Sequence, residues 1–259
     1  MEEQRYDVWA SGAAYDRYMG RWSRAVAREF TAWLGRPDAL AWLDVGCGTG
    51  VLSGVVRERC RPRLIVGCDR SEGFVRVARA AVVADAMALP VRDGAFDVAV
   101  SGLTLNFLPQ PAAAVAGMAR AVHRDGGLVA AYVWDYAERM GLLRHFWDTA
   151  AELDPAAVEL DEARRFPYCR PQPLHDLWTD AGLTDVVVRA IEIPTVFADF
   201  ADLWGPFLAG QGPAPGYVAA LTLADRDRLR EALRAAVPTE HDGSIPLSAR
   251  AWAVRGRTG

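Results

Sequence analysis

The sequence predicts an α/β fold in which helices cover both faces of a mostly parallel sheet. Short apolar segments alternate with helical segments through the first half of the chain, which is the pattern of a parallel sheet. The chain has 259 residues, 51% of them hydrophobic, enough for a full core without disulfides or a metal. We therefore expect a single domain over residues 1–259.

The elements of the first half follow from their apolar patterns. Residues 5–35 predict a short helix, a bend at Gly20 and a longer helix from about Trp22, because apolar and aromatic residues recur at helical spacing. Strands are then predicted at 41–45, 64–68, 82–84, 96–101 and 127–134, and helices at 49–59, 72–81 and 111–122.

After Trp134 the strict alternation ends. Residues 140–175 predict helices and loops with four prolines between Pro155 and Pro173, and residues 174–181 predict a helix that Gly182 stops. Apolar alternation predicts two last strands at 185–196 and 247–255. Between them, residues 198–236 predict helices on either side of a Gly/Pro loop at 210–216.

Composition and charge exclude several classes of protein. The formal net charge is −4, and all 29 basic residues are Arg, so no overall field attracts nucleic acid. No window of about 18 apolar residues could span a membrane, and the polar start lacks the apolar segment of a signal peptide. The four cysteines (Cys47, Cys60, Cys68, Cys169) lack metal-ligand spacing. We expect a reduced, cytoplasmic monomer or homodimer with no metal and no nucleic-acid partner.

The most specific motif is the segment Leu43-Asp44-Val45-Gly46-Cys47-Gly48-Thr49-Gly50, which follows a predicted strand and opens a helix. Glycines let the backbone pass close to a ligand, and the start of the helix presents free N–H groups. The dinucleotide fingerprint has its third glycine at the sixth position, where this sequence has Val51. The spacing therefore disfavours an NAD-dependent oxidoreductase.

This motif resembles motif I of class I S-adenosylmethionine-dependent methyltransferases, and further segments match at the expected places. Asp69 stands 23 residues after Gly46, where the family keeps an acidic residue on the ribose hydroxyls. The segment 85–90 resembles the family's adenine-binding segment, 96–101 resembles motif IV, and 125–134 resembles strand five. The nearest subgroup is that of the ubiquinone and menaquinone C-methyltransferases (methyltransferase type 11).

The resemblance implies a Rossmann-like seven-stranded sheet: five parallel strands, a last antiparallel pair and a helical lid. Residues 40–135 would form the donor-binding core and 247–256 the last strand. Residues 5–35 would be lid helices, and 140–180 and 198–236 substrate-side insertions. The implied cofactor is S-adenosylmethionine, with S-adenosylhomocysteine as product. The implied donor-binding residues are Tyr15, Arg21, Asp44, Gly46, Cys47, Gly48, Gly50, Asp69, Arg70, Asp85, Ala86 and Ser101.

Methyl transfer from a sulfonium requires positioning more than a dedicated catalytic group. A general base is needed only if the acceptor must lose a proton. Asn106 could contact the substrate or cap the following turn. His145 could act as a base or be a partly buried helix residue. Residues 101–109 lack the Asn/Asp-Pro-Pro-Tyr/Phe motif that relatives acting on nucleic acids and protein amides often carry.

The aromatic residues suggest the class of acceptor. Trp9, Tyr15, Tyr18 and Trp22, with Trp204 and Phe207, could line an apolar acceptor pocket or form the core of the lid. We expect a small apolar or aromatic acceptor, methylated at O, C or N in secondary metabolism. Two alternatives stay open: a donor-binding relative with a different reaction, and an accessory subunit that binds the donor without turnover.

Overall fold

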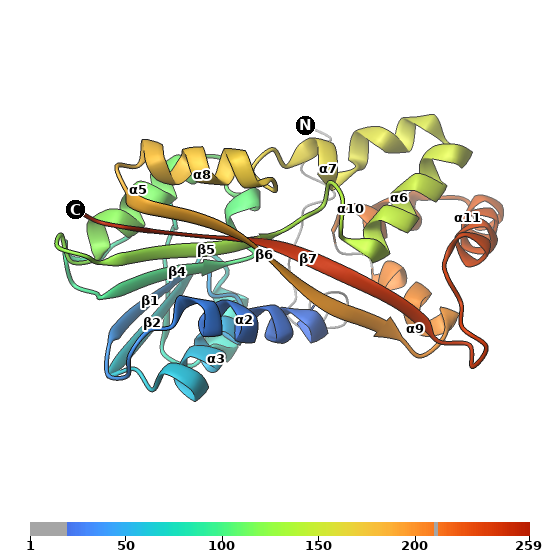
Figure 1. Ribbon diagram of the computed structural model, residues 1–259. Helices are drawn as coiled ribbons and strands as arrows, with labels where there is room; N and C mark the ends of the chain where they lie inside the picture. The colour runs from blue at the N-terminus through green and yellow to red at the C-terminus, as the bar shows by residue number, and fades with distance from the viewer. Residues whose placement is uncertain (1–19, 210–211) are drawn as a thin grey trace. The chain divides into compact units, whose positions relative to one another are not determined.

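The computed structural model describes residues 20–209 and 212–259 (Figure 1). The chain divides into two compact units, and each is described by itself. The sheet unit comprises Ser23–Trp134, Tyr168–Ile191 and Ala251–Gly259. The helical unit comprises Asp135–Pro167 and Glu192–Arg250 and includes residues 20–22.

A seven-stranded sheet in the order β3-β2-β1-β4-β5-β7-β6 confirms the predicted fold class. Strands β1 to β5 pair in parallel, and β7 pairs with β5 in antiparallel fashion. The strand order reverses between β1 and β4, which is where open α/β sheets bind their ligands. The strands are β1 (Ala41–Val45), β2 (Leu64–Asp69), β3 (Ala81–Val83), β4 (Val98–Gly102), β5 (Leu128–Trp134), β6 (Thr184–Phe197) and β7 (Ile245–Arg257).

Helices lie on both faces of this sheet, which explains why its central strands are so apolar. In Figure 1, α2 (Arg21–Leu34) and α3 (Val51–Cys60) lie on one face, and α5 (Pro111–Ala121) and α8 (Pro171–Asp180) lie on the other. All residues of β1 and β5 are buried. A strand covered on both sides needs apolar residues at successive positions rather than in alternation.

Two predicted boundaries in the sheet unit are wrong. The helix predicted at 72–81 ends early as α4 (Glu72–Val77), because Ala78 is extended (ψ 135°) and Ala80 has a φ of +59°. The chain thereby turns into β3 one residue earlier than predicted. The fourth strand begins at Val98 and not at Phe96, which forms only an isolated bridge with Val122.

The helical unit has an aromatic core. Phe146 stacks on Phe207 at 4.4 Å and meets the edges of Trp147 at 4.9 Å and Tyr217 at 6.3 Å. Phe207 is fully buried, so it belongs to the core of this unit. The elements are α6 (Gly141–Leu153), η4 (Pro155–Leu160), α7 (Glu162–Arg165), α9 (Phe200–Trp204), η5 (Gly205–Ala209), α10 (Pro213–Ala220) and α11 (Leu223–Ala236).

The prediction of a Gly/Pro loop at 210–216 is wrong from residue 213 onward, where α10 begins. Pro213 opens α10, because proline fits the first helical turn, where its missing N–H is not needed. No helix within the described ranges is long and apolar enough to cross a membrane.

Candidate functional site

The glycine-rich turn joins β1 to α3 at the carboxyl edge of the sheet. Gly46, Gly48 and Gly50 have φ values of +70°, +53° and +86°, a left-handed conformation that favours glycine. Gly50 precedes α3, and no side chain caps the helix. The first N–H groups of α3 therefore lack helical partners and can donate to a ligand.

Two of these glycines are required for different reasons. A Cβ on Gly46 would lie 2.3 Å from Thr104 Cγ2, so the loop after β4 packs directly on the turn. The Thr104 hydroxyl also donates a hydrogen bond of 2.9 Å to the Gly46 carbonyl. A Cβ on Gly48 would meet no atom within 4 Å. The first glycine thus allows internal packing, and the second leaves open space.

Asp44 lies fully buried in β1, just before the turn. The Ser53 hydroxyl donates to its Oδ2 at 2.7 Å, whereas its Oδ1 is buried without a hydrogen-bond partner among the described residues. Burial raises the pKa of this carboxyl to about 6, although Ser53 partly offsets the effect. A buried carboxylate oxygen that receives no hydrogen bond from the protein suits a cationic or N–H group of a ligand.

The carboxyl ends of β2 and β3 present the other predicted acids. Asp69 accepts hydrogen bonds from the backbone N–H groups of Gly48 at 3.0 Å and Ser71 at 2.8 Å, which fix its orientation. Asp85 accepts from the Met87 N–H at 2.9 Å. Each carboxylate oxygen has a second lone pair, so both side chains can still accept hydrogen bonds from a ligand.

The other residues predicted to bind the methyl donor differ in how exposed they are. The Cys47 side chain packs against Gly67, and the Cys47 backbone N–H donates a hydrogen bond to the Cys68 carbonyl at 2.9 Å. Burial raises the pKa of the Cys47 thiol. Ala86 is buried and Arg70 is exposed. The Ser101 hydroxyl is buried and has no partner within the described chain.

Asn106 lies in the short 3-10 helix η3 (Leu105–Phe107), which follows β4. Its Nδ2 is buried and has no hydrogen-bond partner among residues 20–209 and 212–259, and no side chain caps the start of α5, the next helix. The capping alternative therefore has no support in the described structure. Thr104, two residues earlier, ties this segment to Gly46.

Arg21, His145 and Tyr15 do not join this group in the sheet unit. Arg21 belongs to the helical unit, where its Nη1 reaches both Asp202 carboxylate oxygens at 3.0 and 3.1 Å. Its guanidinium also lies over the rings of Trp22 and Phe197 at 4.6 and 4.7 Å. Arg21 thus already has a carboxylate partner, and its role in binding the methyl donor stays a prediction. Tyr15 lies outside the described residues, as do Trp9 and Tyr18.

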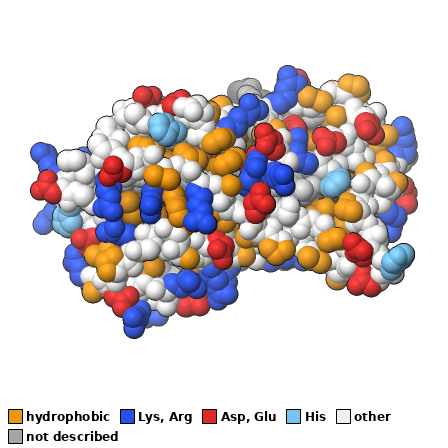
Figure 2. Space-filling model, in the orientation of Figure 1, with side chains coloured by type: hydrophobic (Ala, Val, Ile, Leu, Met, Phe, Trp, Pro, Cys, Tyr) orange, Lys and Arg blue, Asp and Glu red, His pale blue; other side chains and the backbone are white. Residues whose placement is uncertain are grey.

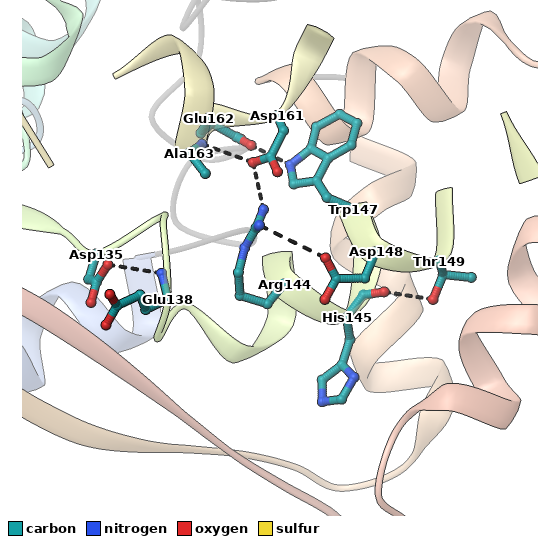
Figure 3. Close-up of polar contacts among 10 residues, drawn as sticks. All are labelled: Asp135, Glu138, Arg144, His145, Trp147, Asp148, Thr149, Asp161, Glu162 and Ala163. Atoms are coloured by element: carbon teal, nitrogen blue, oxygen red, sulfur yellow. Dashed lines mark hydrogen bonds and ion pairs between the residues drawn. The ribbon is translucent and has the colours of Figure 1, made fainter. Parts of the chain in front are cut away.

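His145 lies on α6 in the helical unit. Figure 3 shows its ring directed away from the neighbouring polar cluster of Arg144, Asp161 and Glu162. Partial burial lowers the pKa of His145, so the ring is neutral near pH 7.

Glu162 in this polar cluster was not predicted from the sequence. It is 3% exposed, accepts a hydrogen bond from the Trp147 indole, and has its pKa raised by burial to about 7. No group of three potential metal ligands is found in the described part of the chain.

Comparison with known proteins identifies the class that this turn and these acids define. The sequence profile of the methyltransferase domain family matches residues 43–130. A demethylmenaquinone methyltransferase of Roseiflexus castenholzii is 33% identical over 172 residues, which cover 58% of this chain and 70% of the relative. The chain belongs to the class I S-adenosylmethionine-dependent methyltransferases.

The other relatives differ in their acceptors. A malonyl-(acyl-carrier protein) O-methyltransferase of Herminiimonas arsenicoxydans is 29% identical over 92% of this chain and 88% of its own length. A tRNA (carboxymethyluridine(34)-5-O)-methyltransferase of Xenopus tropicalis is 33% identical over 133 residues, 46% of this chain. The chain spans only 20% of that relative's length.

A solved structure shows the same fold at low sequence identity. Phosphoethanolamine N-methyltransferase 2 of Haemonchus contortus, in complex with S-adenosylhomocysteine, has a TM-score of 0.56 and 14% identity. The match covers 95% of this chain and 56% of that one. The match to the methyltransferase domain family and the sequence relatives named as methyltransferases favour methyl transfer over the donor-binding alternatives without it.

S-adenosylmethionine fits the residues present. The open space at Gly48 and the uncapped start of α3, whose first N–H groups lack helical partners, suit such a group. When bound, this cofactor supplies an activated methyl group on sulfur. The protein then has to hold donor and acceptor in line and exclude water.

Proposed function

We propose that the chain methylates an oxygen atom of a small molecule with an apolar or aromatic body. The observation that carries this proposal is the buried, unpartnered Nδ2 of Asn106, beside the Thr104 that holds Gly46. A buried amide N–H group without a hydrogen-bond partner costs free energy. This position therefore suits a methyl acceptor whose oxygen atom can accept that hydrogen bond.

In this proposal the donor lies over Gly46, Gly48 and Gly50. Asp69 accepts from the ribose hydroxyls. Asp85 and the Ala86 N–H hold the adenine. Asp44 Oδ1 faces a positively charged group of the donor. These roles agree with the hydrogen bonds that orient Asp69 and Asp85 and leave acceptor capacity on both.

An oxygen acceptor reduces the need for a base. A carboxylate is ionised at neutral pH and can attack without a base, whereas a phenol, with an ordinary pKa of about 10, has to lose its proton. Two of the three relatives described above are named as O-methyltransferases, which supports oxygen as the attacked atom.

A tRNA acceptor is the second candidate, because of the resemblance to the Xenopus enzyme. It is less favoured, since the chain has a net charge of −4 and that match covers less than half of it.

The test is transfer of labelled methyl from S-adenosylmethionine to a pool of phenols, quinols and carboxylic acids, with total tRNA as a parallel substrate. We expect label in the small-molecule fraction. We also expect Asn106→Ala to lower transfer while S-adenosylhomocysteine affinity is kept. The exposed amide Gln110 provides the matched control Gln110→Ala, which should behave as the wild type. Label found in tRNA alone would overturn the assignment of the acceptor.

A further inference from the structure

Three arginines of the sheet unit gather at the sheet edge opposite the glycine-rich turn. Arg255 and Arg257 are two residues apart on β7, so their side chains leave the same face of the strand. Arg257 pairs with Leu128, the first residue of the parallel strand β5. Arg36 follows α2, which packs on this face through the contact of Phe30 with Tyr132 at 4.8 Å.

Backbone contacts hold two of these guanidinium groups in place without neutralising them. Arg255 lies over the Trp33 ring at 4.8 Å and donates to the Trp33 carbonyl at 3.3 Å. Arg257 donates to the Gly126 carbonyl at 3.3 Å. Figure 2 shows Arg side chains standing in a row on the face in view, over the sheet between α8 and α2. A carbonyl accepts a hydrogen bond but carries no full negative charge, so the positive charges add.

Arg36 is the half-buried member of this group. Its Nε is buried and has no hydrogen-bond partner within the described ranges. Burial first, and then the nearby charges of Arg257 and Arg255, lower the pKa of Arg36. Asp97 offsets part of this effect, but its carboxylate is already engaged by the Ala41 N–H at 2.7 Å and by Arg63 at 3.1 Å.

The three arginines thus have only partial charge compensation, from Asp97. None of the three arginines forms an ion pair with any described residue, although acidic residues outnumber basic ones, 33 to 29, in the whole sequence. Guanidinium groups bind phosphoryl oxygens through paired N–H donors. We propose that Arg36, Arg255 and Arg257 form a binding site for a phosphoryl oxyanion, separate from the donor site at the other edge of the sheet.

The test is calorimetric titration of the full chain with pyrophosphate, at constant ionic strength and in the presence of saturating S-adenosylhomocysteine. Arg36→Gln and Arg257→Gln should each weaken pyrophosphate binding about tenfold or more. The control is Arg228→Gln on α11, an exposed arginine paired with Asp225, which should bind as the wild type does. All variants should keep wild-type affinity for S-adenosylhomocysteine, so failure of this site is distinguishable from failure of the donor site.

A competition arm identifies the source of the oxyanion. Displacement of pyrophosphate by tRNA would assign the site to a phosphodiester backbone, and lack of displacement would assign it to a small phosphorylated ligand. The proposal is overturned if pyrophosphate does not bind the wild type, or if Arg228→Gln weakens binding as much as Arg36→Gln.

Discussion

Replacement of Gly48 by alanine tests the donor site, because this position combines a left-handed backbone with open space. Its φ is +53°, and an added Cβ would meet no atom within 4 Å. The left-handed conformation costs an alanine about 1–2 kcal/mol, so we expect a folded variant with that loss of stability. Gly182→Ala is the matched control, since Gly182 also lies in the sheet unit, has a φ of +77° and has open space around it.

Only Gly48 lies in the proposed donor site, so the two variants should differ in binding. The new methyl group would occupy space that the donor fills, and such overpacking costs about 1–3 kcal/mol. Because about 1.4 kcal/mol corresponds to a tenfold change, we expect affinity for S-adenosylhomocysteine to fall about tenfold or more in Gly48→Ala. Urea denaturation measures the stability and calorimetry the affinity. Unchanged affinity in Gly48→Ala would refute the placement of the donor over this turn.

Three further predictions concern buried contacts. Gly46→Ala should lose more stability than Gly48→Ala, because its Cβ would lie 2.3 Å from Thr104 Cγ2, and Thr104→Gly should partly restore it in urea denaturation. The affinity for S-adenosylmethionine, measured by calorimetry, should rise from pH 5 to pH 7. The carboxyl of Asp44 has its pKa raised to about 6, and a cationic methyl donor favours the charged form of that carboxyl. Asp44→Asn should remove this pH dependence of the affinity. The pKa of Glu162 is raised from 4.5 to about 7, so the folded state keeps its proton longer than the unfolded state does. The unfolding free energy should therefore fall as pH rises between these values, and Glu162→Gln should flatten that slope; an equal slope in both proteins would contradict the burial argument.

The sheet and much of the donor side could be predicted from the sequence, because they depend on local patterns. Buried parallel strands produce apolar runs, and carboxyl ends of adjacent parallel strands meet at one edge. The spacing of Gly46 and Asp69 therefore places both at that edge, where Asp69 accepts from the Gly48 N–H.

The ends of some helices and strands, and contacts between residues far apart in the chain, could not be predicted from the sequence, because they depend on tertiary packing. Residues 78–81 include three alanines, a helix-forming composition, yet pairing of β3 with β2 ends α4 at Val77. The carboxylate beside Arg21 is Asp202, which lies 181 residues away in the sequence. The burial of Glu162 depends on the packing of Trp147, and no local pattern near Glu162 indicates it.

Calorimetric titration of the purified chain with S-adenosylhomocysteine, with NAD⁺ as the control ligand, decides whether the glycine-rich turn binds the methyl donor. We expect saturable binding of S-adenosylhomocysteine, lost or strongly weakened in Gly48→Ala, and no measurable binding of NAD⁺. Binding of NAD⁺ alone by the folded protein would contradict this expectation.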